Sequence, residues 1–228
     1  MPKEKEDLFL TVLKSLEAHK VLKELVLLGD GCLICYRDLF GGAEAIPAPT
    51  TLDMDLLVLH PKKAMAPVDV SKLLQSMDFE EQLSYATGFS KFTREELSVE
   101  FLMPVQGDGG EKVYQVQSLS MGVQGVRNLN FTEEDLMTLP FRGLQVRVPR
   151  PEVFTLLKIL SHEERRNPQK QERDLETARQ LADFLMSQDD YSRLFRQAFG
   201  RLTRKQQKAL IRITHDKGLP INNLLLAP

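Results

Sequence analysis

The stretch TTLDMDLLVLH, residues 50–60, places two aspartates, Asp53 and Asp55, in an otherwise apolar run. Residues two apart in a β-strand share a face, so both carboxylates are expected to point the same way. Leu57 and Leu59 continue that face as apolar, and the other face is apolar throughout, which is typical of a central strand buried on both sides. Two unpaired carboxylates there would repel each other and resist desolvation, and a divalent cation would relieve both costs.

An isolated Asp-x-Asp pair is more often a solvated strand end, so a second acidic strand carries weight. The segment LSVEFLM, residues 97–103, has one wholly apolar face, and on the other face Glu100 stands between Ser98 and Leu102. One glutamate inside a strand is commonly a surface residue. Three carboxylates on two strands, however, can hold two Mg²⁺ ions about 3.5–4 Å apart, one activating a hydroxyl and one binding a triphosphate.

Composition and charge limit the class of protein. The 228 residues are 42% hydrophobic and 27% charged, with a formal net charge of −2, so nothing draws the whole chain to nucleic acid or to an anionic membrane. No run approaches the roughly 20 apolar residues of a membrane span, and the first residues lack the apolar core of a signal peptide. We expect a soluble, cytoplasmic protein without a membrane partner.

Hydrophobic periodicity divides the chain into a mixed part and a helical part. In the first part we expect strands at residues 24–29, 52–60, 97–104, 112–119 and 143–149, helices at 4–22, 32–40 and 67–79, and a hairpin over 80–93. After Pro149 we expect helices at 149–166, 170–186, 189–200 and 203–216. The predicted class is α+β: a domain with a mixed β-sheet and flanking helices over 1–148, followed by an all-helical domain over 149–228.

Cys32 and Cys35 form a C-x-x-C pattern just after the first predicted strand. A redox pair would sit at such a helix start, but Gly31 stands where that motif usually has an aromatic residue. A zinc site would need a second pair of ligands. Two small buried residues on a packed helix are the better interpretation.

The order of these segments resembles the nucleotidyltransferase fold of DNA polymerase beta type. That pattern is an apolar strand, a Gly-Gly or Gly-Ser turn and a helix, then an Asp-x-Asp strand and a later strand with one carboxylate; here it reads LVLLGDGCLICY, TTLDMDLLV and LSVEFLMP. The helical segment is similar to bacterial AbiEii- and MenT-like toxins of this fold. The matching positions there are Pro149, Pro151, Glu152, Lys158, Arg165 or Arg166, Lys170 and Asp174.

The resemblance implies a role for each matching residue. Asp53, Asp55 and Glu100 would be catalytic and would bind Mg²⁺ or Mn²⁺, with Glu100 helping to activate the acceptor hydroxyl. Cations would meet phosphate charge where it develops. The residues implied in nucleotide binding are Gly29, Asp30, Gly31, Thr51, Lys158, Arg166 and Lys170.

The implied function is Mg²⁺-dependent transfer of a nucleoside monophosphate from an NTP to a hydroxyl on RNA, such as tRNA, or on protein. A toxin-like role with an antitoxin partner follows from the same resemblance. Two alternatives stay open: a catalytically inactive nucleotidyltransferase-fold protein that binds nucleotide or protein, and a glycosyltransferase that uses Asp-x-Asp to hold Mn²⁺. Asp30 favours the first alternative, because it stands where the family has glycine or serine. The short α/β region and the early second acidic strand argue against the other.

Overall fold

The computed structural model describes residues 3–49, 52–60, 67–85, 88–105, 110, 112–127, 129, 131–163 and 167–226. The chain forms two compact units. The first comprises residues 1–39 and 48–149, and the second comprises residues 40–47 and 150–228. The domain boundary predicted from the sequence lies at 148/149, and the second unit also includes the short segment Phe40–Pro47 from early in the chain.

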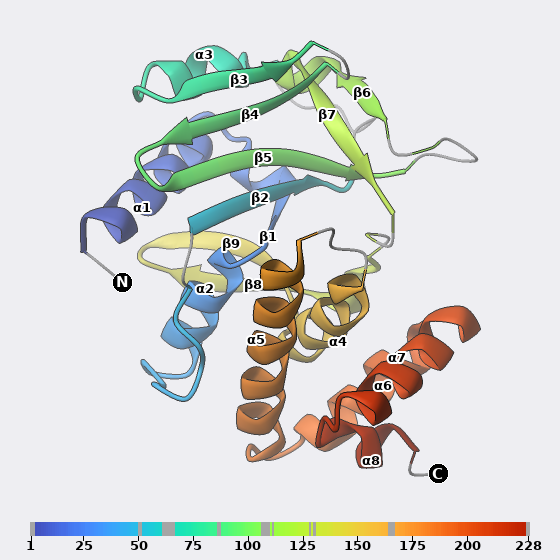
Figure 1. Cartoon of the computed structure of the whole chain (residues 1–228). Coiled ribbons are helices and arrows are strands. Elements are labelled where there is room, and N and C mark those ends of the chain that lie inside the picture. Colours follow the sequence, from blue (N-terminus) through green and yellow to red (C-terminus); the bar gives the residue numbers. More distant parts are fainter. Residues whose placement is uncertain are drawn as a thin grey trace. The chain divides into compact units, whose positions relative to one another are not determined.

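The first unit is built on a mixed sheet, in which the described residues form seven strands (Figure 1). Its main path runs β1-β2-β5-β4-β3, with β7 paired to β5 and β6 paired to β7. The β2–β5 and β5–β7 pairs are parallel, and the others are antiparallel. The strands are β1 (Leu25–Leu28), β2 (Leu52–Val58), β3 (Glu80–Ser84), β4 (Phe89–Arg94), β5 (Leu97–Pro104), β6 (Val113–Val116) and β7 (Met121–Val126).

A separate two-stranded ribbon and three helices complete this unit. The ribbon pairs β8 (Leu136–Phe141) with β9 (Leu144–Pro149). The helices are α1 (Lys3–Ala18), α2 (Gly31–Leu39) and α3 (Val70–Gln75). In Figure 1, α1 lies behind the sheet, where it contacts β2 and β5. Asp69 caps α3 by accepting a hydrogen bond from the Lys72 amide at 3.0 Å.

Strand β2 is buried on both faces, as expected of a central strand. Met54, Leu56 and Val58 on one face are at most 1% exposed. On the acidic face, Leu57 and Leu59 join a hydrophobic cluster with Val26, Leu28 and Leu136. The aspartates therefore stand at the beginning of a strand whose continuation is core, and they are held in place by it.

Helix α2 carries both cysteines as buried residues, which confirms the packing interpretation. The Cys32 thiol donates to the Leu27 carbonyl at 3.1 Å. Burial, with a smaller effect of Asp38, raises the pKa of Cys35 to about 12, so its thiol stays protonated at neutral pH and is a poor nucleophile. Tyr36 fixes the helix to the end of β9, because its hydroxyl donates to the Pro149 carbonyl at 2.7 Å.

The second unit is helical, and its described helices are α4 (Pro151–His162), α5 (Pro168–Met186), α6 (Tyr191–Arg201), α7 (Arg204–Asp216) and α8 (Ile221–Leu226). Asn167 caps α5 through the amides of Gln169 and Lys170, and Thr203 forms a capping box with Gln206 at the start of α7. Phe40 also belongs to this unit, with its ring 5.1 Å from that of Phe184 and 6.1 Å from that of Tyr191.

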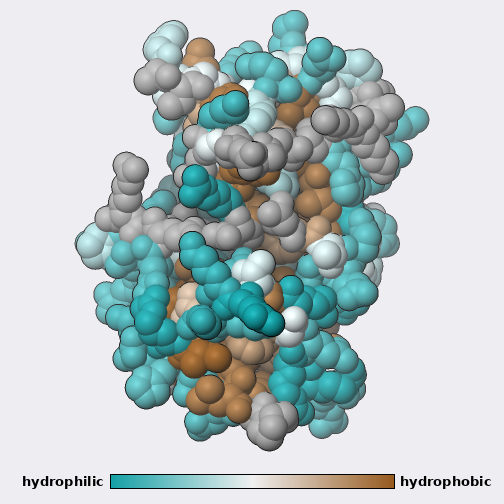
Figure 2. Space-filling view, turned by 90° about the vertical axis from the view of Figure 1, so that its right-hand side faces the viewer, coloured by the Kyte–Doolittle hydropathy of each residue, from teal (hydrophilic) through white to brown (hydrophobic). Residues whose placement is uncertain are grey.

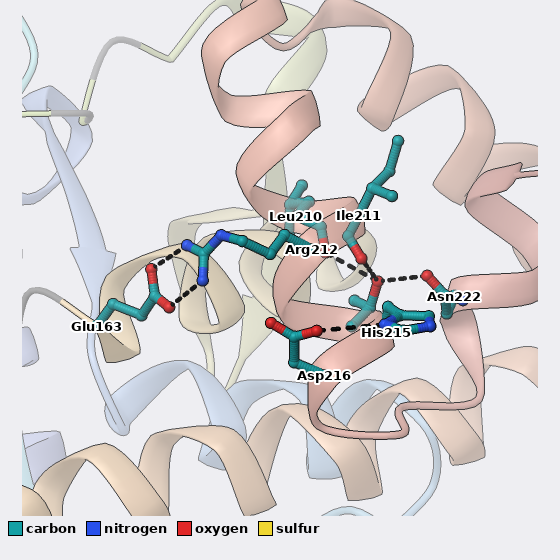
Figure 3. Close-up of polar contacts among 8 residues, drawn as sticks. Glu163, Leu210, Ile211, Arg212, His215, Asp216 and Asn222 are labelled. Atoms are coloured by element: carbon teal, nitrogen blue, oxygen red, sulfur yellow. Dashed lines mark hydrogen bonds and ion pairs between the residues drawn. The ribbon is translucent and has the colours of Figure 1, made fainter.

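Polar contacts join α7 to its neighbours in this unit (Figure 3). The Arg212 guanidinium donates to both oxygens of Glu163, just after α4, at 2.8 and 2.6 Å. Through this hydrogen bond, Arg212 lowers the pKa of Glu163 below its usual value. The Thr214 hydroxyl lies 2.9 Å from Asn222 Oδ1 on α8. The side chains of Arg212 and Glu163 are both exposed, so their ion pair contributes little to the stability of this unit.

Hydrophilic side chains cover most of the face drawn in Figure 2, with scattered hydrophobic patches between them. The described residues include few large exposed hydrophobics: Leu39, Leu83, Tyr85 and Leu226. None of the helices within the described ranges has the length and apolar character needed to cross a membrane.

Candidate active site

The turn after β1 sits directly against the aspartate strand. Gly29 has a left-handed backbone, with φ of +68°. A Cβ at this position would lie 2.6 Å from Asp55 Oδ2 and 3.1 Å from the Asp53 carbonyl oxygen. No side chain fits there, so the backbone of the turn approaches the carboxylate as closely as a chain can. The same turn leads into α2, whose N-terminal end carries the positive pole of the helix dipole and suits an anion.

Asp53 is oriented by a residue of the neighbouring parallel strand. Its partner in the β2–β5 register is Ser98, and the Ser98 hydroxyl donates to Asp53 Oδ1 at 2.6 Å. Ser98 is only 7% exposed. The short hydrogen bond to a charged acceptor fixes one oxygen of the carboxylate.

A second row of side chains runs across three strands. Asp55 on β2 is in register with Glu100 on β5, and Glu100 is in register with Lys91 on β4. Directly paired residues point to the same side of a sheet, with strands about 4.8 Å apart. The Lys91 ammonium lies 2.8 Å from Glu100 Oε1. Asp55, Glu100 and Lys91 therefore form a row, in that order, on one face of the sheet.

Lys91 is a cation among three carboxylates. Burial lowers its pKa, but the hydrogen bond and charge of Glu100, helped by the charges of Asp53 and Asp55, outweigh burial, so the pKa lies above its usual value. The ammonium stays charged at neutral pH and neutralises part of the acidic face.

The donor chemistry fits a divalent cation at the two aspartates. Both carboxylates come from one strand face and are partly exposed, and hard oxygen donors suit Mg²⁺ or Mn²⁺. Among the described residues, no group of three His, Cys, Asp or Glu side chains is arranged to hold a metal ion. The Lys91 ammonium lies at Oε1 of Glu100, so a cation shared with the aspartates would have to bind Oε2 or compete with Lys91.

Comparison with protein families agrees with this geometry. A family model described as nucleotidyltransferase matches residues 8–202, a span that contains β1, β2, β5 and the helices α4 to α6. The chain belongs to this nucleotidyltransferase family. No match was found among curated proteins.

A solved structure shows the same fold. It is an antigenic nucleotidyltransferase-like protein from Paracoccidioides brasiliensis, with a TM-score of 0.50 and 15% sequence identity over 94% of this chain and 88% of that chain. The expected fold class, a nucleotidyltransferase-like mixed sheet with flanking helices followed by a helical region, is confirmed. The narrower resemblance to AbiEii- and MenT-like proteins stays a prediction.

Three further residues near the turn and the aspartate strand were expected to bind nucleotide, and the structure describes two of them. Asp30 is 7% exposed and is not without interaction partners. Gly31 begins α2 and makes room for α1, because a Cβ there would lie 2.9 Å from the Phe9 ring. Thr51 lies outside the described residues.

The basic residues implied by the resemblance belong to the second unit. Lys158 on α4 is buried and donates to Asp174 Oδ1 on α5 at 2.7 Å. Lys170 is exposed in the first turn of α5. Arg165 and Arg166 lie outside the described residues. A role of Lys158, Lys170 or Arg166 in nucleotide binding stays a prediction.

Sequence reasoning missed Ser98 and Lys91 as parts of the site. Glu95 and Glu96 connect β4 to β5, and that two-residue turn fixes the pairing of Lys91 with Glu100. Counting back from the predicted 97–104 strand through a tight turn would have identified Lys91. Ser98 precedes Glu100 by two residues, so its place on the acidic face was visible in the alternation.

Gly29→Ala is expected to weaken both folding and nucleotide binding. A left-handed backbone costs an alanine about 1–2 kcal/mol. The new Cβ would lie only 2.6 Å from Asp55 Oδ2, so the Asp55 carboxylate would have to move. We expect a lower melting temperature and loss of the stabilisation by Mg²⁺ and NTP that the wild type should show. Thermal unfolding with and without these ligands measures both effects.

Gly143→Ala is a matched control for that substitution. Gly143 has φ of +84°, and no atom lies within 4 Å of where its Cβ would be. The backbone cost is therefore similar, but no carboxylate moves. Equal losses of ligand stabilisation in the two variants would contradict a role for the Gly29 turn at the site.

Proposed function

We propose that the chain transfers a nucleoside monophosphate from an NTP to a hydroxyl acceptor at Asp53, Asp55 and Glu100. The observation that carries the proposal is the close approach of the Gly29 turn to Asp55, because it brings the start of α2, the positive end of the helix dipole, to a carboxylate row. A cation bound at Asp53 and Asp55 would neutralise triphosphate charge and align the α-phosphate.

The proposed reaction is an in-line displacement. The acceptor oxygen forms a bond to the α-phosphorus while the bond from that phosphorus to the bridging oxygen breaks. Pyrophosphate leaves with the bonding electrons, and the hydroxyl proton passes to a nearby carboxylate, for which Glu100 is the candidate. Ser98 holds Asp53 and the Gly29 turn limits the movement of Asp55, so the carboxylates need little reorganisation.

The charge of the second unit favours RNA over protein as the acceptor. From Tyr191 to His215 the chain carries seven arginines and lysines and no aspartate or glutamate. Arg193 and Arg212 are in ion pairs with acidic residues outside that stretch. The five further cations on α6 and α7 are exposed: Arg196, Arg201, Arg204, Lys205 and Lys208. Such a surface attracts a polyanion by releasing its counterions. With the AbiEii- and MenT-like resemblance, this supports a tRNA-directed, toxin-like activity countered by an antitoxin.

A second candidate function is that of an inactive nucleotidyltransferase-fold protein that binds nucleotide or a protein partner. The pairing of Lys91 with Glu100 favours it, because a cation already neutralises the third carboxylate. The first function remains the better supported, since both aspartates and the close turn are present.

Transfer of label decides between the two functions. The full chain is incubated with Mg²⁺ and each α-labelled NTP, together with total RNA or a mixture of proteins. We expect label to be transferred to RNA. The transfer should fail when the reaction is run at high salt or when Mg²⁺ is chelated. The opposite result is thermal stabilisation by Mg²⁺ and NTP with no label in RNA or protein for any of the four NTPs. That result would favour the inactive binding protein over the enzyme.

A further inference from the structure

The position of Lys91 in the carboxylate row is fixed by the pairing of β4 with the strands on both sides. Five backbone-paired residues tie β4 to β3, and four tie it to β5. The Lys91 side chain is 33% exposed and that of Glu100 is 25% exposed, so their 2.8 Å ion pair is partly shielded from water. A pair in this setting is less screened by salt than an ion pair on the open surface.

The formal charge of the four side chains on β2, β5 and β4 is negative. Asp53, Asp55 and Glu100 contribute three negative charges and Lys91 one positive charge, which leaves −2 for these four. One divalent cation neutralises this sum. A second cation beside Glu100 would face the ammonium at short range, and the site would carry a positive excess before any nucleotide arrived.

We propose that Lys91 takes the place of a second divalent cation beside Glu100, so that the nucleotide-free protein binds one cation, at Asp53 and Asp55. This inference rests on the proposed function, since it assigns the number of cations at the same site. Lys91 is a positioning residue here: it fixes Glu100 and supplies positive charge, and it contacts neither the cation nor the nucleotide. The third carboxylate is then free of metal and able to accept a proton.

Counting bound Mn²⁺ tests this directly on the nucleotide-free full chain. The signal of free Mn²⁺ in electron paramagnetic resonance is titrated for the wild type, Lys91→Met, Glu100→Gln and Lys72→Met. Lys72 forms an exposed ion pair with Asp69 in the same unit, so its variant controls for loss of a lysine. Circular dichroism and thermal unfolding establish that each variant is folded.

We expect one Mn²⁺ per chain for the wild type and for Lys72→Met. Lys91→Met should bind a second Mn²⁺ or bind the first about tenfold more tightly, because Glu100 becomes available as a ligand. Glu100→Gln in the otherwise natural chain should still bind one Mn²⁺, with an affinity lowered by less than about tenfold, because it removes a negative charge but no ligand, and removal of a true ligand costs more than the 10- to 100-fold of an outer-shell partner.

Two results would overturn the inference while leaving the proposed function standing. One is two Mn²⁺ ions in the wild type, of which Glu100→Gln loses one. The other is equal Mn²⁺ number and affinity for Lys91→Met and the wild type, both folded. Absence of Mn²⁺ binding in all four proteins, with no label transfer from any NTP, would instead remove the proposed function and this inference with it.

Discussion

Asp53→Asn is expected to reduce nucleotidyl transfer by at least about 100-fold while the protein stays folded. Loss of an outer-shell partner of a metal ligand typically costs 10- to 100-fold, so loss of a ligand charge should cost no less. The fold should tolerate the change, because asparagine keeps the Oδ1 acceptor that the Ser98 hydroxyl contacts at 2.6 Å. Removing one of two like charges from the acidic face also relieves repulsion with Asp55.

Initial rates of label transfer and thermal unfolding measure the two effects for this variant. Asp69→Asn is a suitable control, since Asp69 caps α3 and asparagine is an equally good cap. It should leave the rate and the melting temperature close to those of the wild type. Full activity in Asp53→Asn would exclude Asp53 as a ligand and with it the assigned site.

Asp174→Asn is expected to destabilise the second unit by about 3–5 kcal/mol, as is typical when one partner of a buried ion pair is removed. The side chains of Lys158 and Asp174 are 9% and 4% exposed, and their ion pair is 2.7 Å long. Asparagine would remove the negative charge that Asp174 places 2.7 Å from the buried Lys158 ammonium. For a chain of this size, such a loss corresponds to a fall in melting temperature of about 10 °C.

The double variant Lys158→Met/Asp174→Leu separates the charge effect from packing. Replacement of both partners by apolar groups is often close to neutral, and the Lys158 ammonium already lies 5.6 Å from the Phe154 ring centre, so an apolar side chain has neighbours there. We expect the double variant to regain most of the lost stability. If Lys158→Met unfolds at the wild-type temperature yet loses label transfer, Lys158 acts on the nucleotide and is not chiefly structural.

The carboxylate strands were predictable because their pattern is local. The alternation in TTLDMDLLVLH and LSVEFLM fixes which side chains share a face, and the structure adds the parallel register that joins Asp55 to Glu100. The register itself needs the pairing partner, which no single strand specifies. Ser98 and Lys91 could be placed on the acidic face from the sequence, but their contacts with Asp53 and Glu100 depend on that register.

Strands β7 and β8 escaped prediction because their sequences contain residues that usually break strands. Gly122 and Gly125 lie in β7, where an added Cβ would lie 2.6 Å from Val113 and 2.5 Å from Tyr114. These glycines read as loop residues, yet the close approach of β6 requires them. Pro140 in β8 is tolerated because that strand has a single partner, β9, among the described residues.

The membership of Phe40–Pro47 in the helical unit has a consequence for synthesis on the ribosome. The chain passes between units after Leu39, after Pro47 and again after Pro149. Phe40 is made early, whereas its ring partners Phe184 and Tyr191 are made about 140 residues later. At the usual elongation speed of about 5–20 residues per second, Phe40 waits roughly 7–30 seconds for them. A fragment that stops at Pro149 would lack Phe184 and Tyr191, so this segment would never gain those ring partners. The segment comes just before β2, the aspartate strand, in the sequence.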